Sequence, residues 1–572
     1  MILLTIGMGS AHGQALAEPT LPQQTVNLTL PSQGSATCPT LSSGSNCIRN
    51  VPAANAKALQ SAINAATCGD TIVLAAGSTY SGNFTIPSTS CSGWIEIVSS
   101  GLANLPPSGN RVGPANVANM ATISTPNSSS AIQFLPSSNH WRLIGLEVTT
   151  SAKFMYFLIT LGLTTSSTEV TVQSQLPAYV ILDHLYIHGL ASETGSIQEG
   201  VRMDTQAFGI VDSYCDEIGG NGLESQCFLS SGNGVGPYLI QNNFIQASSE
   251  NIMFGGADPV ITNIVPSDIT IIGNLIQKNT AWRNNTSWGA FKNLFELKNA
   301  QRVLLDGNVL QYTWAQAQDE AIILRSANQS GACTWCVVQD VTVSHNIIRH
   351  APIGVVLAPA PNQGDKVVPT QRILIRNNLF SDISSVNWGG HGWVFHLSTD
   401  TTPQSHDWIL DHNTSFSDQA LIFLGDAGTV NNVQITNMIA DYGSYGIIGN
   451  AVGSGTVALT TFLTNYAYND IVFRTNSTGK YPSGTFWSPN LEVTGFTSYS
   501  GTTPNVSGNF QLTSGSPYHN AGTDGKDIGV WDWTCLNYAT AAALAGKFVP
   551  GAGCGLSTEL PRPPTNLNVV VQ

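Results

Sequence analysis

The sequence predicts an all-β protein, a single right-handed parallel β-helix of about ten coils with a helical cap at its N-terminal end. One observation is a window that recurs along the chain, as in "YLIQNNFIQ" (238–246), "VLLDGNVLQ" (303–311) and "ILIRNNLFS" (373–381). A second observation is that apolar residues stand two apart within each window and β-branched side chains are frequent, as in a strand with one buried face. The third observation is a column of aligned asparagines: Asn243, Asn274, Asn308, Asn346, Asn378 and Asn413.

The spacing of that column favours the β-helix over other repeat folds. Successive asparagines are 31, 34, 38, 32 and 35 residues apart, which is too short for a four-stranded propeller blade. The apolar period of two excludes helical repeats. Each coil of a β-helix supplies about three short strands and stacks ~4.8 Å from the next. Asparagine tolerates a left-handed turn between strands, and its amide can bond the asparagines above and below it.

The chain on either side of the repeat divides into short segments. Residues 1–17 start with apolar residues and end in Ala-Leu-Ala, which predicts a signal peptide and a secreted protein, and 18–52 form an N-terminal extension. The β-helix is predicted over 53–530, and its cap helix lies in 53–67, where apolar residues recur at helical spacing. The remaining boundaries are a closing cap at 531–556 and a Pro-rich tail at 557–572.

The composition restricts the partners of the protein. Charged residues make up 10% of the chain, against about 25% in an average soluble protein. A net charge of −14 argues against a general binder of nucleic acid or of anionic membranes. An acidic polysaccharide remains possible as a partner, because the local field of a groove can oppose the overall sign. No apolar run reaches the ~18 residues that would span a bilayer.

Ten cysteines fall into close sequential pairs. In an exported protein such pairs predict local disulfides that fix loops. The "CTWC" at 333–336 could instead be redox-active or half of a zinc site, but no second CxxC or HxxxH completes a metal site. The predicted disulfides are Cys38–Cys47, Cys68–Cys91, Cys215–Cys227, Cys333–Cys336 and Cys535–Cys554.

Scarce charged residues are expected to meet on one outer face of the β-helix. Side chains of a strand alternate between its two faces, so if Phe295 and Leu297 point inward, Glu296 and Lys298 point outward. Arg325 takes the equivalent place one coil later. Equivalent strands would present the other candidates for this groove: Arg202, Asp204, Glu224, Gln226, Glu250, Asn251, Asp258 and His396. The plain alternative is an ion-pair ladder covering a sheet, in which each pair contributes little.

The stretches "LQSAINAATCGDTIVLAAGSTYSGNFTI" (59–86), "WIEIVSS" (94–100) and "HWRLIGLEVTTS" (140–151) resemble the start of secreted β-helix proteins of the pectin-lyase-like superfamily. The pattern is most similar to polysaccharide lyase family 6, which includes alginate lyases and chondroitinase B. The whole of roughly 55–530 is also similar to uncharacterised bacterial secreted right-handed β-helix proteins, so the resemblance in fold is broader than the resemblance in function. Fold by itself does not carry function.

This resemblance implies a chemistry. Family 6 lyases cleave uronate-containing polysaccharides by β-elimination: a lysine removes the proton α to the carboxylate, an arginine on the next coil assists the leaving group, and Ca²⁺ neutralises the uronate. Lys298, just before the turn Gly307-Asn308, and Arg325 on the following coil match the catalytic positions. The resemblance makes Arg202, Asp204, Glu224 and His396 substrate-binding candidates, and Glu296, Glu250 and Asn251 metal-ligand candidates. Just before the lysine the chain carries only Glu296, where the family has a fuller acidic cluster.

Two other hypotheses about the function remain. A glycoside hydrolase needs paired carboxylates, for which the sequence offers Asp212, Asp216, Glu217, Asp204 and Glu224. A non-catalytic adhesive, structural or glycan-binding β-helix also suits the low charge and the disulfides. In any of these readings, exposed aromatic residues near the groove could stack on sugars: Trp282, Trp288 and Trp314.

Overall fold

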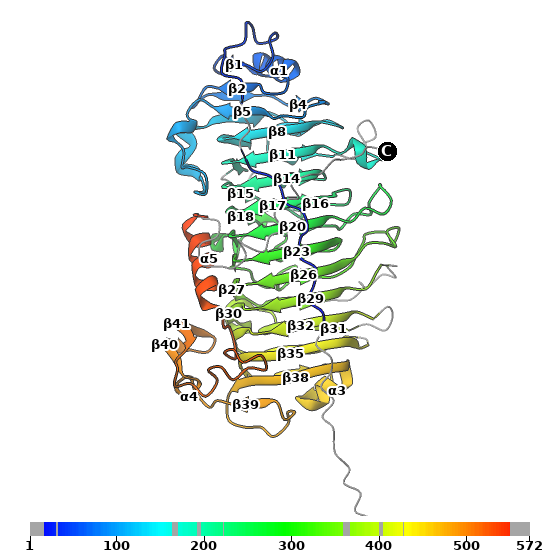
Figure 1. Cartoon of the computed structure of the whole chain (residues 1–572), viewed down its shortest axis with the longest axis vertical. Helices are drawn as coiled ribbons and strands as arrows, with labels where there is room; N and C mark the ends of the chain where they lie inside the picture. The colour runs from blue at the N-terminus through cyan, green and yellow to red at the C-terminus, as the bar shows by residue number, and fades with distance from the viewer. Residues whose placement is uncertain are drawn as a thin grey trace, which may run out of the picture.

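The protein is the predicted right-handed parallel β-helix (Figure 1). Its structure is a computed structural model that describes residues 16–29, 33–162, 170–190, 196–220, 222–357, 367–399, 404–426 and 428–548. Each coil passes through three sheets in the same order, which we call sheet 3, sheet 1 and sheet 2. Strands of successive coils pair in parallel within each sheet. Sheets 1 and 2 join at the C-terminal end, where single long strands run through both.

Sheet 3 carries the outer face on which the charged candidates were expected. Its strands, in stacking order, are β4 (Phe84–Ile86), β7 (Ile132–Phe134), β10 (Phe154–Leu161), β13 (Ser196–Met203), β16 (Gln226–Ser230), β19 (Ile252–Phe254), β22 (Phe295–Leu297), β25 (Glu320–Leu324), β28 (Ile353–Leu357), β31 (Trp393–Thr399), β34 (Ala420–Asp426), β36 (Gly446–Gly449) and β37 (Gly453–Ser454). The last strand, β37, pairs antiparallel and ends the sheet.

Sheets 1 and 2 form the other two walls. Sheet 1 contains β1 (Ile48–Val51), β2 (Thr71–Leu74), β5 (Ile95–Ser99), β8 (Asn139–Ile144), β11 (Ala178–Asp183), β14 (Gln206–Val211), β17 (Tyr238–Gln241), β20 (Ser267–Ile272), β23 (Ala300–Asp306), β26 (Val338–Ser344), β29 (Gln371–Arg376), β32 (His406–Asp411), β35 (Val430–Asp441) and β38 (Leu463–Arg474). Sheet 2 contains β3 (Thr79–Ser81), β6 (Ala121–Thr125), β9 (Leu146–Thr150), β12 (Tyr186–His188), β15 (Tyr214–Ile218), β18 (Phe244–Ala247), β21 (Leu275–Gln277), β24 (Val309–Gln311), β27 (Ile347–Ala351), β30 (Leu379–Ile383), β33 (Thr414–Ser417) and β39 (Thr485–Trp487).

The asparagine column forms a continuous ladder at the turn from sheet 1 to sheet 2. Asn308 Oδ1 accepts hydrogen bonds from the backbone N and the Nδ2 of Asn274, at 2.9 and 3.0 Å, and Asn346 Oδ1 does the same for Asn308. The left-handed conformation falls on the residue before each asparagine, such as Gly307 with φ 64°. The expectation that the asparagine itself takes the left-handed turn is therefore wrong, and its role is hydrogen bonding inside the wall.

Inward side chains of all three sheets form one apolar core, and a helix covers each end. α1 (Ala56–Ala65), which confirms the predicted cap helix, buries Leu59, Ala62 and Ile63 against the first coil. α3 (Thr456–Phe462) buries Ala458 and Leu459 at the other end. The stack ends need such covers because an open end exposes core and unpaired strand edges. Among the helices of the described residues, none is long and apolar enough to cross a membrane.

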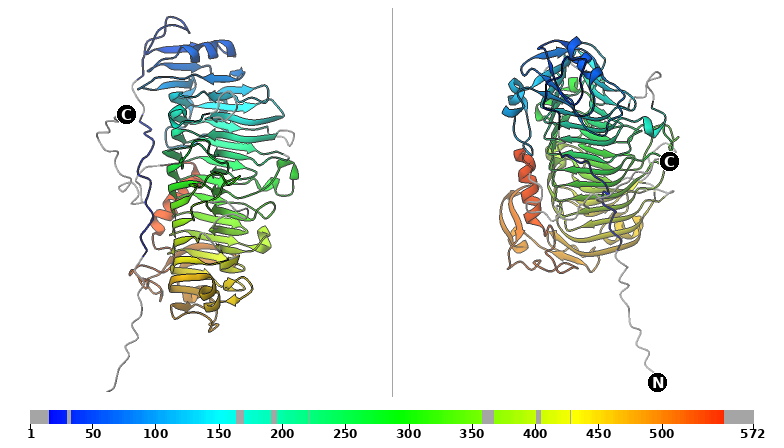
Figure 2. Two further views of the ribbon diagram at one scale, coloured as in Figure 1. Left: turned by 90° about the vertical axis from the view of Figure 1, so that its right-hand side faces the viewer. Right: turned by 45° about the horizontal axis from the view of Figure 1, so that its top comes forward.

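The N-terminal extension continues as a strap along the outside of sheet 1. Residues 16–29 run across successive strands as an extended segment, dark blue in Figures 1 and 2. Backbone N–H groups of Thr20 and Gln23 donate to Asp340 and Asp268 at 3.1 and 2.8 Å. Val26 packs with Ile181 in a small apolar cluster on the outer face. The strap therefore ties together coils that are far apart in the stack.

The parallel ladders end at β39, so residues 488–530, predicted to belong to the β-helix, lie outside them. That segment holds α4 (Leu491–Thr494) and an antiparallel hairpin of β40 (Phe496–Thr502) and β41 (Asn505–Leu512). α5 (Trp533–Ala545) then lies along the flank of the stack in Figure 1. The hairpin and α5 bury apolar residues against Leu379 and Phe416 of sheet 2, which is why the apolar pattern continued past the last coil.

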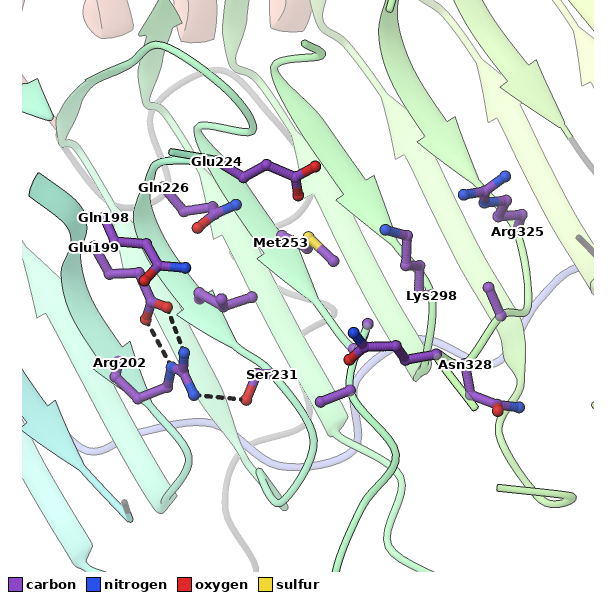
Figure 3. A pocket seen from close by; sticks show the side chains of 16 residues that line it. Gln198, Glu199, Arg202, Glu224, Gln226, Ser231, Met253, Lys298, Arg325 and Asn328 are labelled. Carbon is purple, nitrogen blue, oxygen red and sulfur yellow. Dashed lines mark hydrogen bonds and ion pairs between the residues drawn. The ribbon is translucent and has the colours of Figure 1, made fainter. Parts of the chain in front are cut away.

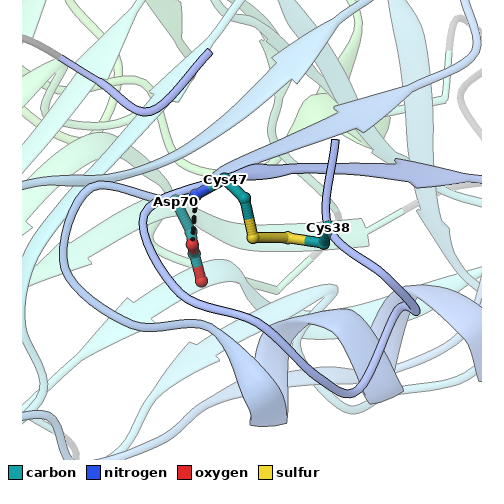
Figure 4. Close-up of side chains that lie close together, drawn as sticks. All are labelled: Cys38, Cys47 and Asp70. Atoms are coloured by element: carbon teal, nitrogen blue, oxygen red, sulfur yellow. Dashed lines mark hydrogen bonds between the residues drawn. A yellow bond between two sulfur atoms is a disulfide. The ribbon is translucent and has the colours of Figure 1, made fainter. Parts of the chain in front are cut away.

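Four of the five predicted disulfides are present: Cys38–Cys47, Cys68–Cys91, Cys215–Cys227 and Cys333–Cys336. The first lies beside Asp70, which accepts a hydrogen bond from the Cys47 N–H at 2.9 Å (Figure 4). Asp70 also pairs with the buried Arg49 at 2.8 Å. The sulfurs of Cys38 and Cys47 are bonded to each other, so this cluster has a structural role and stabilises the first coil. The fifth predicted pair, Cys535–Cys554, cannot be followed because Cys554 lies outside the described residues. Residues 1–15 of the predicted signal peptide and the whole Pro-rich tail, 557–572, also lie outside them.

Candidate functional site

A groove follows the outer face of sheet 3 over strands β13 to β25 and has a volume of about 530 Å³. Each strand enters the sheet with two consecutive inward residues, such as Leu294 and Phe295, which are fully buried in the core. This bend turns the residue before the pair outward, and normal alternation then brings Glu296 and Lys298 to the same outer face. The same pattern repeats at Ala321 and Ile322, so equivalent residues of neighbouring coils line up.

The register of the strands sorts the outward residues into rows that run along the groove. Glu199 pairs with Gln226, and Met253 with Glu296. One row, which we call the acidic row, lies at the start of each strand: Glu199, Gln226, Glu250, Asn293 and Glu320. The side chains of Gln226 and Glu250 confirm this alignment with a 2.7 Å hydrogen bond. A second row, mostly apolar, runs beside it: Arg202, Leu229, Met253, Glu296, Ile323 and Val356.

Lys298 and Arg325 form the basic edge of the groove. They directly follow Leu297 and Leu324, which pair in register, so the two cations lie side by side on adjacent coils (Figure 3). Lys298 Nζ lies 3.2 Å from Glu296 Oε1, and Arg325 Nη2 lies 3.9 Å from the same oxygen. Their side chains are 17% and 28% exposed. The predicted meeting of Glu296, Lys298 and Arg325 is therefore present, and both cations remain accessible from the groove.

The acidic row combines carboxylates of different character. Burial raises the pKa of Glu199, although the Arg202 guanidinium, which donates to it at 2.6 Å, opposes the shift. Burial would also raise the pKa of Glu250, but the Lys292 ammonium and the Gln226 amide outweigh burial and hold that pKa below its ordinary value. Burial and then the charge of Asp319 raise the pKa of Glu320 to about 7. The row thus offers both charged and protonated carboxyl groups near neutral pH.

The structure places the predicted substrate-binding residues in different surroundings. Arg202 and Glu224 line the groove. Asp204 is buried, and its carboxylate accepts from Ser230, Ser231 and the Gly232 N–H, so it organises a turn beside the groove. His396 continues the row of Glu296 two coils beyond Arg325, outside the residues that line the groove, and pairs with Asp426 at 3.5 Å.

The predicted calcium ligands each have a partner within the protein. Glu250 Oε1 lies 3.3 Å from Lys292 Nζ, and Glu296 pairs with Lys298. Asn251 belongs to the inward pair of its strand, and its amide donates to two backbone carbonyls at 2.7 Å while its oxygen accepts from Lys278. Since ammonium groups already contact these oxygens, Glu296, Glu250 and Asn251 do not fit a divalent cation in this arrangement. The calcium itself stays a prediction.

The carboxylates considered for hydrolysis are divided between two faces. Asp216 and Glu217 lie on β15 of sheet 2, and Asp212 accepts from Asn242 and the Gly109 N–H at the turn before that strand. Glu224 faces the groove of sheet 3 instead. Those residues therefore do not form one catalytic pair. The sequence could not separate them because the bend between sheets lies within a few residues of each.

The three tryptophans considered for sugar stacking are buried. Trp282 at the end of η4 (Thr280–Trp282) stacks on Trp288 at the end of η5 (Thr286–Trp288), with ring centroids 4.1 Å apart. Trp314 joins them, and the three are at most 6% exposed. Their faces are covered by one another, so sugar stacking on these rings is excluded, and the cluster instead anchors the loops that border the acidic row.

Sequence reasoning missed two lysines of the site. Lys292 Nζ bridges Glu224 at 2.5 Å and Glu250 at 3.3 Å. Lys278 is completely buried, and its ammonium donates to the carbonyls of Ser249 and Asn293, which flank the acidic row. Burial lowers the pKa of Lys278 to about 7. Lys278 directly follows β21, and Lys292 lies in the irregular segment before β22. Only the scarcity of lysine in a weakly charged chain could have drawn attention to them.

No protein-family model and no curated protein match the chain in sequence. Solved structures resemble it. The alginate lyase AlyGC of polysaccharide lyase family 6 is 10% identical, with 77% of this chain and 53% of that chain covered and a TM-score of 0.42. A mannuronic acid specific family 6 lyase from human gut microbiota is 12% identical, with coverages of 77% and 91% and a TM-score of 0.43. A family 28 exopolygalacturonase of Yersinia enterocolitica is 14% identical, with coverages of 77% and 78% and a TM-score of 0.35. At these identities the likeness concerns the fold.

The raised pKa of Glu320 predicts a pH-dependent stability. The folded protein holds this proton up to about pH 7, whereas the ordinary pKa is 4.5, so stability falls as the pH rises between these values. Glu320→Gln removes the buried charge. We expect the variant to be more stable than the parent by about 1–3 kcal/mol at pH 8 and equal to it at pH 4. Thermal unfolding at pH 4, 6 and 8, with the exposed Glu492→Gln as control, measures this; an equal difference at all three values would contradict it.

Proposed function

We propose that the protein is a secreted polysaccharide lyase that cleaves a uronate-containing chain by β-elimination in the groove of sheet 3. The observation that carries the proposal is the basic edge, where an accessible lysine and an accessible arginine lie side by side on adjacent coils. The chain has only 21 lysines and arginines in 572 residues. Three of them, Arg202, Lys298 and Arg325, line this one groove, and Lys292 contacts Glu250 of its acidic row.

The arrangement supports a division of roles. The Lys298 amine takes the proton on the carbon next to the uronate carboxylate, and the electron pair left behind forms a carbon–carbon double bond. The bond to the glycosidic oxygen breaks, and the Arg325 guanidinium stabilises the charge that develops on that oxygen before solvent protonates it. Fixed cations near the carboxylate stabilise the enolate-like transition state, which is where electrostatic stabilisation contributes most.

The direct test is incubation with alginate, pectate and glycosaminoglycans while absorbance near 235 nm is followed, because elimination creates an unsaturated uronate. A rising signal with at least one uronide is the expected result. Absence of signal on every uronide, together with release of reducing ends from a neutral glycan, would replace the proposal with hydrolysis. Saturable glycan binding without either product would instead favour a non-catalytic binding protein.

Hydrolysis is the second candidate, and Glu320 is the observation that favours it. A glycosidase needs one protonated and one ionised carboxyl group across the scissile bond. Glu320 keeps its proton to about pH 7 and interacts with Glu296 of the neighbouring coil. If reducing ends appear without unsaturated product, Glu320→Gln should abolish their release.

An aromatic shelf borders the end of the groove at β10. Tyr156 and Phe154 are 50% and 40% exposed, and Phe157, next to them, pairs in register with Glu199. The stack rises ~4.8 Å per coil from β10 to β22, so a glycan must be several residues long to reach both the shelf and Lys298.

Tyr156→Ala should therefore weaken the binding of long substrates and leave the binding of short ones unchanged. A stacking contact of about 0.5–1.5 kcal/mol corresponds to a roughly 2- to 13-fold rise in KM for polymer, with no change for the shortest oligosaccharide cleaved. Steady-state kinetics on size-fractionated substrate measures the difference, and Phe486→Ala, which removes an exposed ring on β39, serves as the control. Equal effects on short and long chains would contradict a role for the shelf in binding.

A further inference from the structure

The segment that carries Lys292 is held in place from both sides. Phe291 packs into the tryptophan cluster, with its ring centroid 4.8 Å from that of Trp314, and its N–H donates to Gln316 at 2.9 Å. On the other side, the Asn293 carbonyl accepts from the buried Lys278 ammonium at 3.2 Å. Lys292 therefore projects from an anchored stretch of backbone, and its side chain is only 13% exposed.

The Lys292 ammonium lies between carboxylates contributed by two other coils. It is 2.5 Å from Glu224, whose side chain is 60% exposed, and 3.3 Å from Glu250, whose side chain is fully buried. Burial would lower the pKa of Lys292, but Glu250 and Glu224 outweigh burial and raise it. The ammonium thus stays charged over the whole physiological pH range and holds Glu250 in its charged form.

The acidic row next to this ammonium contains oxygen atoms of the kind that bind a hard cation. Beside Glu250 in the acidic row, Gln226 Oε1 and Asn293 Oδ1 are buried and accept no hydrogen bond from any described residue. Together with Glu224 and Glu250 they are carboxylate and amide oxygens, the ligand types that Ca²⁺ prefers. Lys292 already provides a positive charge at Glu224 and Glu250, and a divalent ion on Glu250 would lie against its ammonium.

We propose that Lys292 is a built-in counter-cation that takes the place of a divalent metal in the acidic row, so that the carboxylates of this row are held without calcium. The inference rests on the proposed function for its meaning, because a metal in this row would lie beside the groove that binds the uronate. Its physical content is independent of turnover: removing the ammonium should convert the acidic row into a calcium site.

Isothermal titration calorimetry of metal-free protein with CaCl₂ tests the inference. We expect no saturable heat for the parent protein and one-site binding for Lys292→Met, with affinity at least about 10-fold above the parent and in the range of extracellular calcium modules. Lys292→Arg, which keeps the charge, should not bind, and Lys292→Met combined with Glu250→Gln should lose the new site. Lys480→Met removes one exposed charge elsewhere and controls for net charge.

The possible results separate cleanly. Saturable calcium binding by the parent that Glu250→Gln abolishes, or calcium binding by Lys292→Met no tighter than in the parent, would overturn the inference. If Lys292→Met does not fold by circular dichroism, Lys292→Gln supplies the same test with a polar side chain. If the protein cleaves no uronide, the proposed function is wrong. The calorimetry would still decide whether Lys292 occupies a cation site. If uronide cleavage is found, it should persist unchanged in EDTA.

Discussion

Lys298→Met should abolish uronide cleavage, lowering kcat by about 10³-fold or more, because a general base contributes typically 10²–10⁴-fold and its loss leaves no other amine at the basic edge. KM should change little, since Arg202, Arg325 and Lys292 remain in or beside the groove to attract the polyanion. The absorbance assay near 235 nm measures both constants. Thermal unfolding should be nearly unchanged, because Lys298 is partly exposed and Glu296 keeps its 2.8 Å hydrogen bond from Asn293.

The matched control for this result is Lys298→Arg. It preserves the positive charge beside Glu296, but a guanidinium does not give up its proton in proteins. If Lys298 acts as a base, Lys298→Arg should be as inactive as Lys298→Met. If it only neutralises charge, Lys298→Arg should keep most of the activity. Retention of more than about a tenth of the parent kcat would exclude the base role, given the magnitude expected for general-base catalysis.

Asn308→Ala should lower the free energy of unfolding by about 2–4 kcal/mol, the largest stability effect that we predict. The Asn308 amide donates to the carbonyls of Ile271 and Asp306 at 2.9 and 3.1 Å and accepts two hydrogen bonds from Asn274. All of these groups are buried inside the wall, so truncation leaves unpaired donors and acceptors, each of which costs about 1–3 kcal/mol before the structure relaxes.

Guanidinium unfolding and thermal melts measure the loss, with Asn64→Ala on the exposed face of α1 as a control expected to change stability by less than about 0.5 kcal/mol. Asn308→Asp tests the mechanism. It keeps the acceptor oxygens but loses the hydrogen bonds that Nδ2 donates to Ile271, Asp306 and Asn346. It also buries a charge, so it should be at least as destabilising as alanine. An Asn308→Ala variant as stable as Asn64→Ala would show that the ladder contributes little to holding the coils together.

The repeat and the basic edge could be predicted from sequence because both depend on strict alternation. Once the asparagine column fixes the register, Glu296, Lys298 and Arg325 must face outward on adjacent coils. Asn251 was misplaced because each strand of sheet 3 begins with two inward residues, a local break in alternation that shifts earlier residues to the other face. Asp212, Asp216 and Glu217 were considered together with Glu224 as hydrolytic carboxylates, although a corner between sheets separates them from it.

Other parts of the site depend on contacts that no local pattern encodes. Lys292 and Lys278 lie in segments between sheets, where the coil length varies and side-chain direction is set by tertiary packing. From the sequence, the three tryptophans were expected to stack on sugars, but they pack against one another and are buried. The hairpin of β40 and β41 carries the same alternating pattern as a coil, so periodicity could not show that it leaves the stack and packs on its flank.

The N-terminal strap gives the folding reaction a built-in order. Contacts between coils join residues that are near in sequence, but Thr20 reaches Asp340 across a separation of 320 residues and Gln23 reaches Asp268 across 245. Loop closure over such distances is favourable only after the intervening coils already stand as a rigid frame. The strap is synthesised before the coils that it joins, yet it is among the last of these segments to become ordered. Slow hydrogen exchange at the Thr20 and Gln23 amides would mark the molecules in which the whole stack is complete.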